Sequence, residues 1–364
     1  MPKAFKHKIK TSKTLFICNV MEAKDYYRVK ITKIISETAK AASFVLEAQD
    51  GWKPIYKPGQ FLTLVFFTMH GEKRRSYSIS SSPACNEALT ITVKKIANGE
   101  FSRWLVDEAR AGDILYCSGI GGQFILPGDD KIFKAFYFYA AGSGITPCFS
   151  LLKTLLVTTK NSITLFYSNR SLREAIFHED LEALAKKYAH RFSIYYFFSN
   201  IMHVEKGRMS FLLLQEKLSR ESQFEKSLNY ICGPWAYMQL VTFAISRVST
   251  NAKIIKENFS TLPRLTLPKP PDTEAHQVTI HYRENMYNIT VQYPDNILSA
   301  ALKNNIMLPY SCRAGRCSSC MATCTSGKIW MAYNEVLVDE EIEKGRILTC
   351  QGYPVENDAV IRFD

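Results

Sequence analysis

Short β-rich apolar stretches, separated by Gly, Pro and Asn residues, occupy the first third of the chain. Such stretches favour strands, and the turn-forming residues between them favour reversals of the chain. One stretch in this series, residues 101–109, predicts a helix instead. The expected strands are residues 26–35, 42–47, 60–67, 75–80, 89–96 and 114–117. Short strands at this spacing predict an antiparallel β-barrel.

From residue 134 onward, strand-like and helix-like stretches alternate. The expected strands are residues 135–140, 163–167, 192–198 and 228–232, and the expected helices are residues 147–156, 173–189, 210–218 and 236–248. This alternation predicts an α/β domain built on a doubly wound parallel sheet.

A proline-rich segment, residues 260–275, follows the second pattern. Its four prolines cannot donate ladder or helix hydrogen bonds, so we expect a semi-rigid linker. Beyond it the pattern predicts a hairpin over residues 276–291, a helix over 297–304 and a cysteine-rich segment. The expected parts of this multidomain chain are a basic tail at 1–27, a first domain at 28–130, a second at 131–259, the linker at 260–275 and a third domain at 276–364.

Composition and charge narrow the class of protein. The 364 residues are long enough for two or three domains, and 46% hydrophobic with 22% charged residues is ordinary for a globular protein. No apolar run approaches the roughly 18 residues of a membrane-spanning helix. The net charge is +12, although residues 275–364 hold eight Lys/Arg against ten Asp/Glu. The positive charge therefore lies in residues 1–274, which suit anionic cofactors or an acidic partner. Because no basic run is interleaved with aromatic residues, we expect no nucleic-acid binding.

Four cysteines carry the most specific signal. Cys312, Cys317, Cys320 and Cys350 follow C-x4-C-x2-C-x29-C, the plant-type spacing for a 2Fe-2S cluster. A four-cysteine zinc site is the alternative, but it more usually shows two C-x2-C pairs. Five of the ten cysteines crowd into the last 53 residues. This clustering indicates thiolates on a metal in a reducing cytoplasm, and it disfavours the disulfide framework of a secreted protein.

Two segments of the predicted barrel together suit a flavin nucleotide, although the first alone would be read as an exposed strand. The strand at 75–78 offers a cation for a pyrophosphate, an aromatic plane for the ring and a hydroxyl for its redox nitrogen. The expected helix after it begins where free N–H groups could hold a phosphate. The candidate flavin-binding residues are Arg75, Tyr77, Ser78, Gly99, Phe101 and Ser102.

The predicted parallel sheet carries candidate nicotinamide-binding residues. Gly142 and Gly144 follow its first strand and allow a tight turn and the close approach of a pyrophosphate, although the third glycine of G-x-G-x-x-G is missing. A plain strand-to-helix turn is the alternative. Cys232 and Gly233 end a later strand.

The end of the second parallel strand bears on the choice of nicotinamide cofactor. No acidic residue follows that strand, where one would favour the free 2′-hydroxyl of NADH. Ser168, Arg170 and Arg208 suit the 2′-phosphate of NADPH through charge-assisted hydrogen bonds, with a solvated basic edge as the alternative. We therefore expect NADPH, and NADH stays open.

In this order, the motifs resemble the ferredoxin–NADP reductase superfamily joined to a C-terminal plant-type ferredoxin domain. The R-x-Y-S, G-x-G-I-T-P and C-G-P motifs of the superfamily match residues 75–78, 142–147 and 232–234. The resemblance implies an antiparallel β-barrel flavin domain, a nicotinamide domain and an α+β ferredoxin-like (β-grasp) 2Fe-2S domain. In module order the chain is similar to the reductases of the phenylacetyl-CoA epoxidase and of related oxygenases and desaturases.

The resemblance also implies cofactors and roles for single residues. FAD, preferred over FMN by this resemblance, would lie near Tyr77 with Ser78 bonded to its N5 atom, and Phe259 would cover its ring. Thr146 and Cys232 would orient the nicotinamide, and the four cysteines would ligate the cluster. Electrons from NADPH would pass through FAD and the cluster to a terminal oxygenase, a desaturase or a haem protein.

Two other classes of protein stay open at this point. A redox-sensing or electron-storing protein would hold flavin and cluster without turnover, and it would show negligible NADPH-dependent reduction of artificial acceptors. A zinc-stabilised interaction module fused to a flavin domain would show no visible absorption from its last 90 residues.

Overall fold

The structure is a computed structural model, and it describes residues 26–69, 71–128, 132–221, 224–260 and 267–363. The described residues divide into two compact units. The first holds the described residues up to Ile120 and those from Phe124 to Asn258, and the second holds Gly121–Gln123 with the residues from Phe259 onward. Among the described residues, no helix is both long and apolar enough to cross a membrane.

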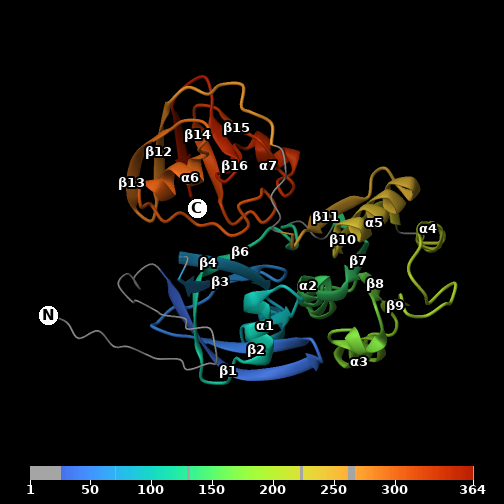
Figure 1. The fold of residues 1–364 in the computed structure, drawn as a ribbon. Helices are drawn as coiled ribbons and strands as arrows, with labels where there is room; N and C mark the ends of the chain where they lie inside the picture. The colour runs from blue at the N-terminus through green and yellow to red at the C-terminus, as the bar shows by residue number, and fades with distance from the viewer. Residues whose placement is uncertain (1–25, 70, 129–131, 222–223, 261–266, 364) are drawn as a thin grey trace. The chain divides into compact units, whose positions relative to one another are not determined.

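The first unit begins with an antiparallel sheet of six strands in the order β4-β3-β6-β1-β2-β5 (Figure 1). An isolated antiparallel bridge between Ile79 and Ile91 joins the chain after β4 to β5, so the sheet closes into the predicted barrel. One helix, α1 (Glu100–Asp107), follows β5. The strands are β1 (Tyr27–Thr38), β2 (Ala41–Ala48), β3 (Phe61–Thr68), β4 (Gly71–Ser78), β5 (Thr90–Lys94) and β6 (Ile114–Gly121).

Alternation of side chains explains the core of this barrel. Leu62, Leu64 and Phe66 are two residues apart on β3, and all three are buried in one apolar cluster because every second side chain of a strand faces the same way. Phe66 stacks on Phe101 of α1, with ring centroids 4.2 Å apart. The single helix therefore packs onto the barrel through an aromatic pair.

The second half of the first unit is a parallel sheet in the order β11-β10-β7-β8-β9. The side chains at 136, 138 and 140 on β7 pack in the cluster that contains α2 and α3, and those at 135, 137 and 139 pack with α4 and α5. Helices thus cover both faces, which confirms the doubly wound prediction. The elements are β7 (Ala135–Ala141), α2 (Ile145–Thr158), β8 (Ser162–Asn169), α3 (His178–Lys187), β9 (Phe192–Phe198), α4 (Phe211–Ser219), β10 (Ser227–Cys232), α5 (Trp235–Val248) and β11 (Lys253–Glu257).

The helix predicted over residues 173–189 begins later than the sequence pattern indicates. Phe177 has a φ of +59°, which no helix interior adopts, and α3 starts directly after it. The ring of Phe177 is buried against Phe149, with centroids 4.2 Å apart. Burial of this apolar side chain therefore overrides the local helical preference. The structure also adds β11, which the sequence pattern did not predict.

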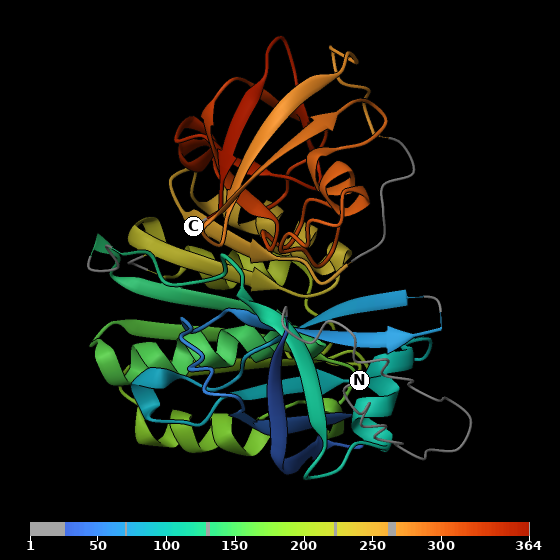
Figure 2. The same cartoon turned by 90° about the vertical axis from the view of Figure 1, so that its left-hand side faces the viewer.

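The second unit is a mixed five-stranded sheet, β13-β12-β18-β14-β16, with a small β15-β17 ribbon; Figure 2 shows it from a second side in orange to red. The predicted hairpin and helix are present as β12 (His276–Tyr282), β13 (Asn285–Val291) and α6 (Ile297–Lys303). This arrangement is the expected α+β ferredoxin-like fold. The remaining elements are β14 (Met321–Ser326), β15 (Ile329–Met331), α7 (Asp339–Glu343), β16 (Arg346–Leu348), β17 (Gly352–Pro354) and β18 (Ala359–Arg362).

Part of the predicted linker belongs to this second unit. Asp272 accepts hydrogen bonds from the backbone N–H of Glu356 at 2.8 Å and from that of Glu274 at 2.9 Å. Pro270 is buried. Residues 261–266 lie outside the described part of the chain. The segment just before β12 is therefore attached to the ferredoxin-like unit.

Candidate functional site

The strand β4 and the helix α1 bring the predicted flavin-binding residues together. Arg75 and Tyr77 lie on β4, which pairs with β3 so that Tyr77 is opposite Leu62. The guanidinium carbon of Arg75 lies 5.3 Å from the ring centroid of Phe101, in the first turn of α1. Burial raises the pKa of the Tyr77 phenol above its usual range, so this ring stays neutral. A cation, a neutral aromatic ring and a helix N-terminus thus meet.

The turn that opens α1 is held by its own side chains. Ser102 donates through its hydroxyl to the carbonyl oxygen of Gly99 at 3.2 Å and accepts from the N–H of Ile96 at 3.4 Å. A Cβ at Gly99 would lie 2.3 Å from the Ser102 oxygen, so a larger residue there would displace the Ser102 side chain. Ser78, at the end of β4, is buried. The first-turn N–H groups of α1 have no helical acceptor and can bind a phosphate.

The glycine turn after β7 and the end of β10 interlock. A Cβ at Gly144 would lie 2.1 Å from the carbonyl oxygen of Cys232, and a Cβ at Gly233 would lie 2.9 Å from the Cβ of Ala141. β7 and β10 are neighbours, with Ala140 opposite Cys232. Gly142 has a φ of +56°, which favours glycine. Two motifs about ninety residues apart in sequence therefore form one site by close packing of their backbones.

Three buried polar side chains line this site. Thr146 is 2% exposed, and its hydroxyl has no hydrogen-bond partner among the described residues. Glu257 ends β11 opposite Cys232, and its Oε2 atom likewise has no partner in the described part of the chain. Burial raises the pKa of Glu257 to about 8. Burial, followed by the nearby Glu257 carboxyl, raises the pKa of the Cys232 thiol well above its usual range.

These orphaned polar atoms fit a nicotinamide. Buried hydroxyl and carboxyl groups normally have partners, and the carboxamide of a nicotinamide offers both a donor and an acceptor. Glu257 was not among the site residues predicted from sequence. The acidic residue that closes the second predicted domain, two residues before Phe259, is the signal that could have found it.

The candidate phosphate-binding residues occupy the carboxyl ends of β8 and β9. The backbone N–H of Asn200 donates to the carbonyl oxygen of Arg170 at 3.0 Å, so the loop after β9 runs beside the end of β8. Arg208 follows a tight turn in which a Cβ at Gly207 would lie 2.4 Å from a carbonyl oxygen. Arg170 and Arg208 are exposed, and Ser168 is partly buried. Phe259, two residues past β11, is 45% exposed.

The four candidate metal ligands form two pairs. Cys312 and Cys317 contact through their thiols, as do Cys320 and Cys350. No three Cys, His, Asp or Glu side chains of the described residues gather around one point. A 2Fe-2S cluster takes two thiolates on each iron, so two pairs fit it. The fifth cysteine of the segment, Cys324, donates instead to the carbonyl oxygen of Ser326 at 3.3 Å.

Backbone N–H groups of the cysteine loop point at sulfur. The N–H of Ala314 donates to the Cys312 sulfur at 3.3 Å, and the N–H of Cys312 donates to the Cys317 sulfur at 3.4 Å. The Cys317 thiol and the backbone N–H groups of Ala314, Arg316 and Cys317 lower the pKa of Cys312 to about 6. Gly315 has a φ of +70°, and a Cβ there would lie 2.9 Å from the carbonyl oxygen of Tyr333. The Cys312 thiol and burial raise the pKa of Cys317 well above its usual range, so the loop favours one thiolate in this pair. Backbone N–H groups that point at sulfur are typical around an iron-sulfur cluster.

Comparisons with known proteins identify three domains in this chain. Residues 27–125 match the model of an oxidoreductase FAD-binding domain, residues 138–242 match an oxidoreductase NAD-binding domain, and residues 282–355 match a 2Fe-2S iron-sulfur cluster binding domain. The chain carries the corresponding FAD-binding, NAD-binding and 2Fe-2S domains.

Known proteins match this chain over more than nine-tenths of its length. The ferredoxin reductase component of 3-ketosteroid-9-alpha-monooxygenase from Mycobacterium tuberculosis is 30% identical, over 92% of this chain and 95% of its own. One component of the 1,2-phenylacetyl-CoA epoxidase from Escherichia coli is 30% identical, over 93% of this chain and 98% of its own. The structure of phthalate dioxygenase reductase has the same fold, with a TM-score of 0.57 at 22% identity over 93% of this chain and 98% of that one.

The fold and its three sites define an oxidoreductase that combines a flavin, a nicotinamide and an iron-sulfur domain. The chain belongs to the ferredoxin–NADP reductase superfamily, among the members that carry a 2Fe-2S domain.

Proposed function

We propose that this protein takes a hydride from NADPH and delivers the two electrons singly to a terminal oxygenase. Bound FAD supplies the hydride acceptor, and a 2Fe-2S cluster carries one electron at a time. The residues of the chain bind and orient these groups. Arg75 and the α1 turn with Gly99 and Ser102 hold the flavin phosphates, and Tyr77 packs beside the ring.

The interlocked turn at Gly144 and Cys232 is the observation that carries this proposal. It supports a pocket in which the unpartnered hydroxyl of Thr146 bonds the nicotinamide carboxamide. The neutral Cys232 thiol packs against the nicotinamide, and Ser78 donates to the flavin N5 atom. Gly142 and Gly233 keep the backbone close enough for both rings to meet.

The charge at the ends of β8 and β9 supports NADPH over NADH. Arg170 and Arg208 are exposed cations on neighbouring segments, and Ser168 adds a hydroxyl. A 2′-phosphate would bind both guanidinium groups, whereas the 2′-hydroxyl of NADH offers them no charge.

The proposed electron acceptor is an oxygenase like those served by the relatives. Two of these are named as parts of a monooxygenase and of an epoxidase system. An epoxidase of the phenylacetyl-CoA type is the particular partner we propose. The second candidate function is an NADH-dependent reductase that delivers electrons to another oxygenase, a desaturase or a haem protein. It is favoured if the exposed arginines do not discriminate between NADPH and NADH.

An anaerobic titration with NADPH and with NADH tests the proposal. Flavin and iron-sulfur absorbance should both bleach at a low NADPH concentration. The Arg170→Ala/Arg208→Ala double variant should raise the KM for NADPH about tenfold or more and leave that for NADH unchanged, because charge-assisted hydrogen bonds are lost. Arg220→Ala, at an exposed arginine after α4, is the control. Flavin bleaching without any iron-sulfur signal would contradict the proposed transfer, and equal bleaching by both nicotinamides would select the second candidate.

A further inference from the structure

A run of three buried serines follows β4, called here the flavin strand because it carries the candidate flavin-binding residues Arg75 and Tyr77. Ser80, Ser81 and Ser82 come directly after β4 and Ile79, and each is at most 3% exposed. Serine is common in turns at the surface, but a buried hydroxyl is stable only with a hydrogen-bond partner. The partners of this run therefore show what it does.

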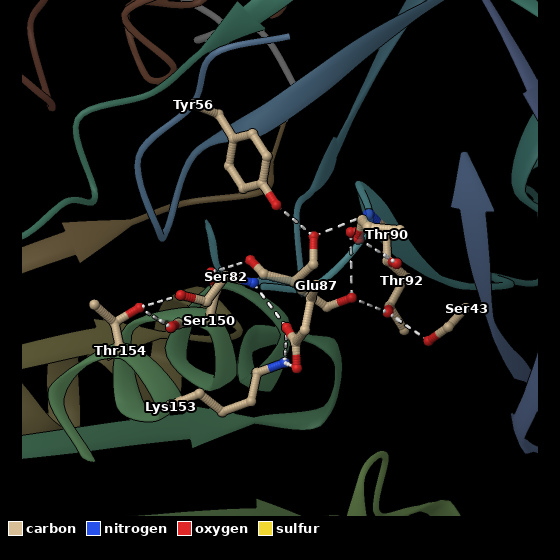
Figure 3. A network of polar contacts seen from close by, with 12 residues as sticks. Ser43, Tyr56, Ser82, Glu87, Thr90, Thr92, Ser150, Lys153 and Thr154 are labelled. Carbon is tan, nitrogen blue, oxygen red and sulfur yellow. Dashed lines mark hydrogen bonds and ion pairs between the residues drawn. The ribbon is translucent and has the colours of Figure 1, made fainter. Parts of the chain in front are cut away.

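The helix α2 supplies the first partners. Thr146, Ser150 and Thr154 are four residues apart, so they lie along one face of the helix. The Ser150 hydroxyl donates to the carbonyl oxygen of Ser81 at 2.6 Å, and the hydroxyls of Ser82 and Thr154 are 2.7 Å apart (Figure 3). The face of α2 that begins with Thr146 is thus bonded to the serine run.

The Thr154 hydroxyl has partners on both sides of this contact. It lies 2.8 Å from the carbonyl oxygen of Ser150, to which it can donate, and either hydroxyl can be the donor in its bond with Ser82. Together with the bond from Ser150 to Ser81, this contact favours one register of α2 against the serine run.

An ion pair adds a third link between the same two segments. The backbone N–H of Ser82 donates to Oε2 of Glu87 at 2.8 Å, and Lys153 of α2 lies 2.7 Å from Oε1 of the same carboxylate (Figure 3). The Lys153 side chain is 12% exposed. Its charge is thus partly removed from solvent, so the pair is screened less than an ion pair at the open surface.

The serine run is also anchored within the barrel. The Ser81 hydroxyl accepts from the N–H of Thr90 at 2.9 Å and lies 2.8 Å from the hydroxyl of Tyr56 (Figure 3). Ser80 accepts from the Thr92 hydroxyl at 2.8 Å. The segment that leaves the flavin strand is therefore rigidly bonded on the barrel side as well as to α2.

We propose that Ser82, Ser150 and Thr154 are positioning residues for hydride transfer. The inference rests on the proposed function, since it gives these hydroxyls the task of setting α2, and with it Thr146, at a fixed distance from the flavin strand. Hydride transfer requires donor and acceptor atoms about 3–3.5 Å apart, and a small displacement slows it strongly. A purely apolar contact would let the helix slide, whereas these directional bonds fix its register.

Two substitutions of Thr154 test the effect of its hydrogen bond separately from the effect of side-chain packing. Thr154→Val keeps the shape and removes the hydroxyl, so the rate of flavin reduction at saturating NADPH should fall about tenfold. Thr154→Ser keeps the hydroxyl and should retain most of the rate. Thr158→Val is the matched control, because the Thr158 hydroxyl bonds only within α2, to the carbonyl oxygen of Thr154 at 2.8 Å, in the contacts described.

The readouts distinguish positioning from loss of structure. Stopped-flow flavin reduction gives the hydride-transfer rate, and the KM for NADPH, the FAD content and the melting temperature should stay close to those of the unmodified protein. Ser82→Ala should slow the same step, and the Ser82→Ala/Thr154→Val pair should be less than additive because both remove one bond. If Thr154→Val and Thr154→Ser are equally slow, or if Thr154→Val matches Thr158→Val, the inference is wrong. If the unmodified protein does not reduce its flavin with NADPH, the proposed function itself fails.

Discussion

The proposed nicotinamide site and the proposed cluster site are built in opposite ways. The nicotinamide site joins the ends of three strands through Gly144, Cys232 and Glu257, which are far apart in sequence. The cluster loop places three of its four candidate ligands within residues 312–320, and Cys350 is the fourth. Long-range packing therefore forms the first site, whereas local backbone conformation forms most of the second. Damage to one site should leave the other intact.

The Cys350→Ser variant is expected to show the largest difference between the effects on the two sites. Cys350 pairs with Cys320, so its loss leaves one iron with a single protein thiolate. We expect the loss of iron-sulfur absorbance and of electron delivery to an external one-electron acceptor, with flavin reduction by NADPH unchanged. Absorbance and iron analysis measure the first effect, and stopped-flow measures the second. Cys324→Ser is the matched control and should keep the cluster; the loss of iron from both variants would mean that the loop is merely unstable.

The converse change is Gly144→Ala. Its Cβ would lie 2.1 Å from the Cys232 carbonyl oxygen, so the two backbone segments must separate. We expect flavin reduction by NADPH to slow about a hundredfold, because the nicotinamide is displaced from the flavin. The cluster absorbance should stay normal. Gly128→Ala, at an exposed glycine with open space around its Cα, is the control; a normal rate in Gly144→Ala would show that the interlock does not position the nicotinamide.

A smaller effect is expected from Gly315→Ala in the cluster loop. The positive φ of Gly315 costs an alanine roughly 1–2 kcal/mol, and its Cβ would press on the Tyr333 carbonyl at 2.9 Å. The loop should bind its cluster less firmly, so iron should be lost faster to a chelator while flavin reduction is unaffected. A chelator-release time course checks this expectation. An unchanged release rate would indicate that the loop tolerates a different conformation at this position.

The contrast between the two sites also explains what the sequence could predict. The spacing of Cys312, Cys317 and Cys320 reports a local loop, so ligand candidates follow directly from it. The barrel and the parallel sheet follow from strand and helix patterns. Glu257 was missed because β11 reads Lys-Ile-Ile-Lys-Glu, a short charged stretch whose burial depends on β10. The serine run was missed because serines are typical of turns, and their burial depends on α2.

The same physical reason accounts for the errors in secondary structure. The start of α3 is set by burial of Phe177 against Phe149, which no local pattern contains. The strands β15, β16 and β17 have three residues each, too few for a period-two pattern to be recognised. Local signals thus predict elements and loops, whereas tertiary contacts decide where elements end and which polar residues become buried.

The last expected effect is a pH dependence confined to the proposed nicotinamide site. Burial raises the pKa of Glu257 from 4.5 to about 8. Between these two pH values the folded protein keeps a proton on Glu257 that the unfolded chain has already lost. Stability should therefore fall as the pH rises from about 5 to 8 and should level off above pH 8. Glu257→Gln has no ionisable group there and should lose this slope.

Melting temperatures across this pH range, measured on the full protein with its cofactors, compare the two proteins. The Glu257→Gln variant should gain relative stability towards pH 8, and the difference between the two proteins should become constant below about pH 4, where the folded and unfolded chains both keep most of the proton. Glu216→Gln, at an exposed carboxylate on α4, is the control and should leave the slope unchanged. Parallel curves for the Glu257→Gln variant and the unmodified protein would mean that Glu257 is solvated or paired in solution. The pocket would then lack the neutral buried acid that distinguishes it from the cysteine-rich cluster loop.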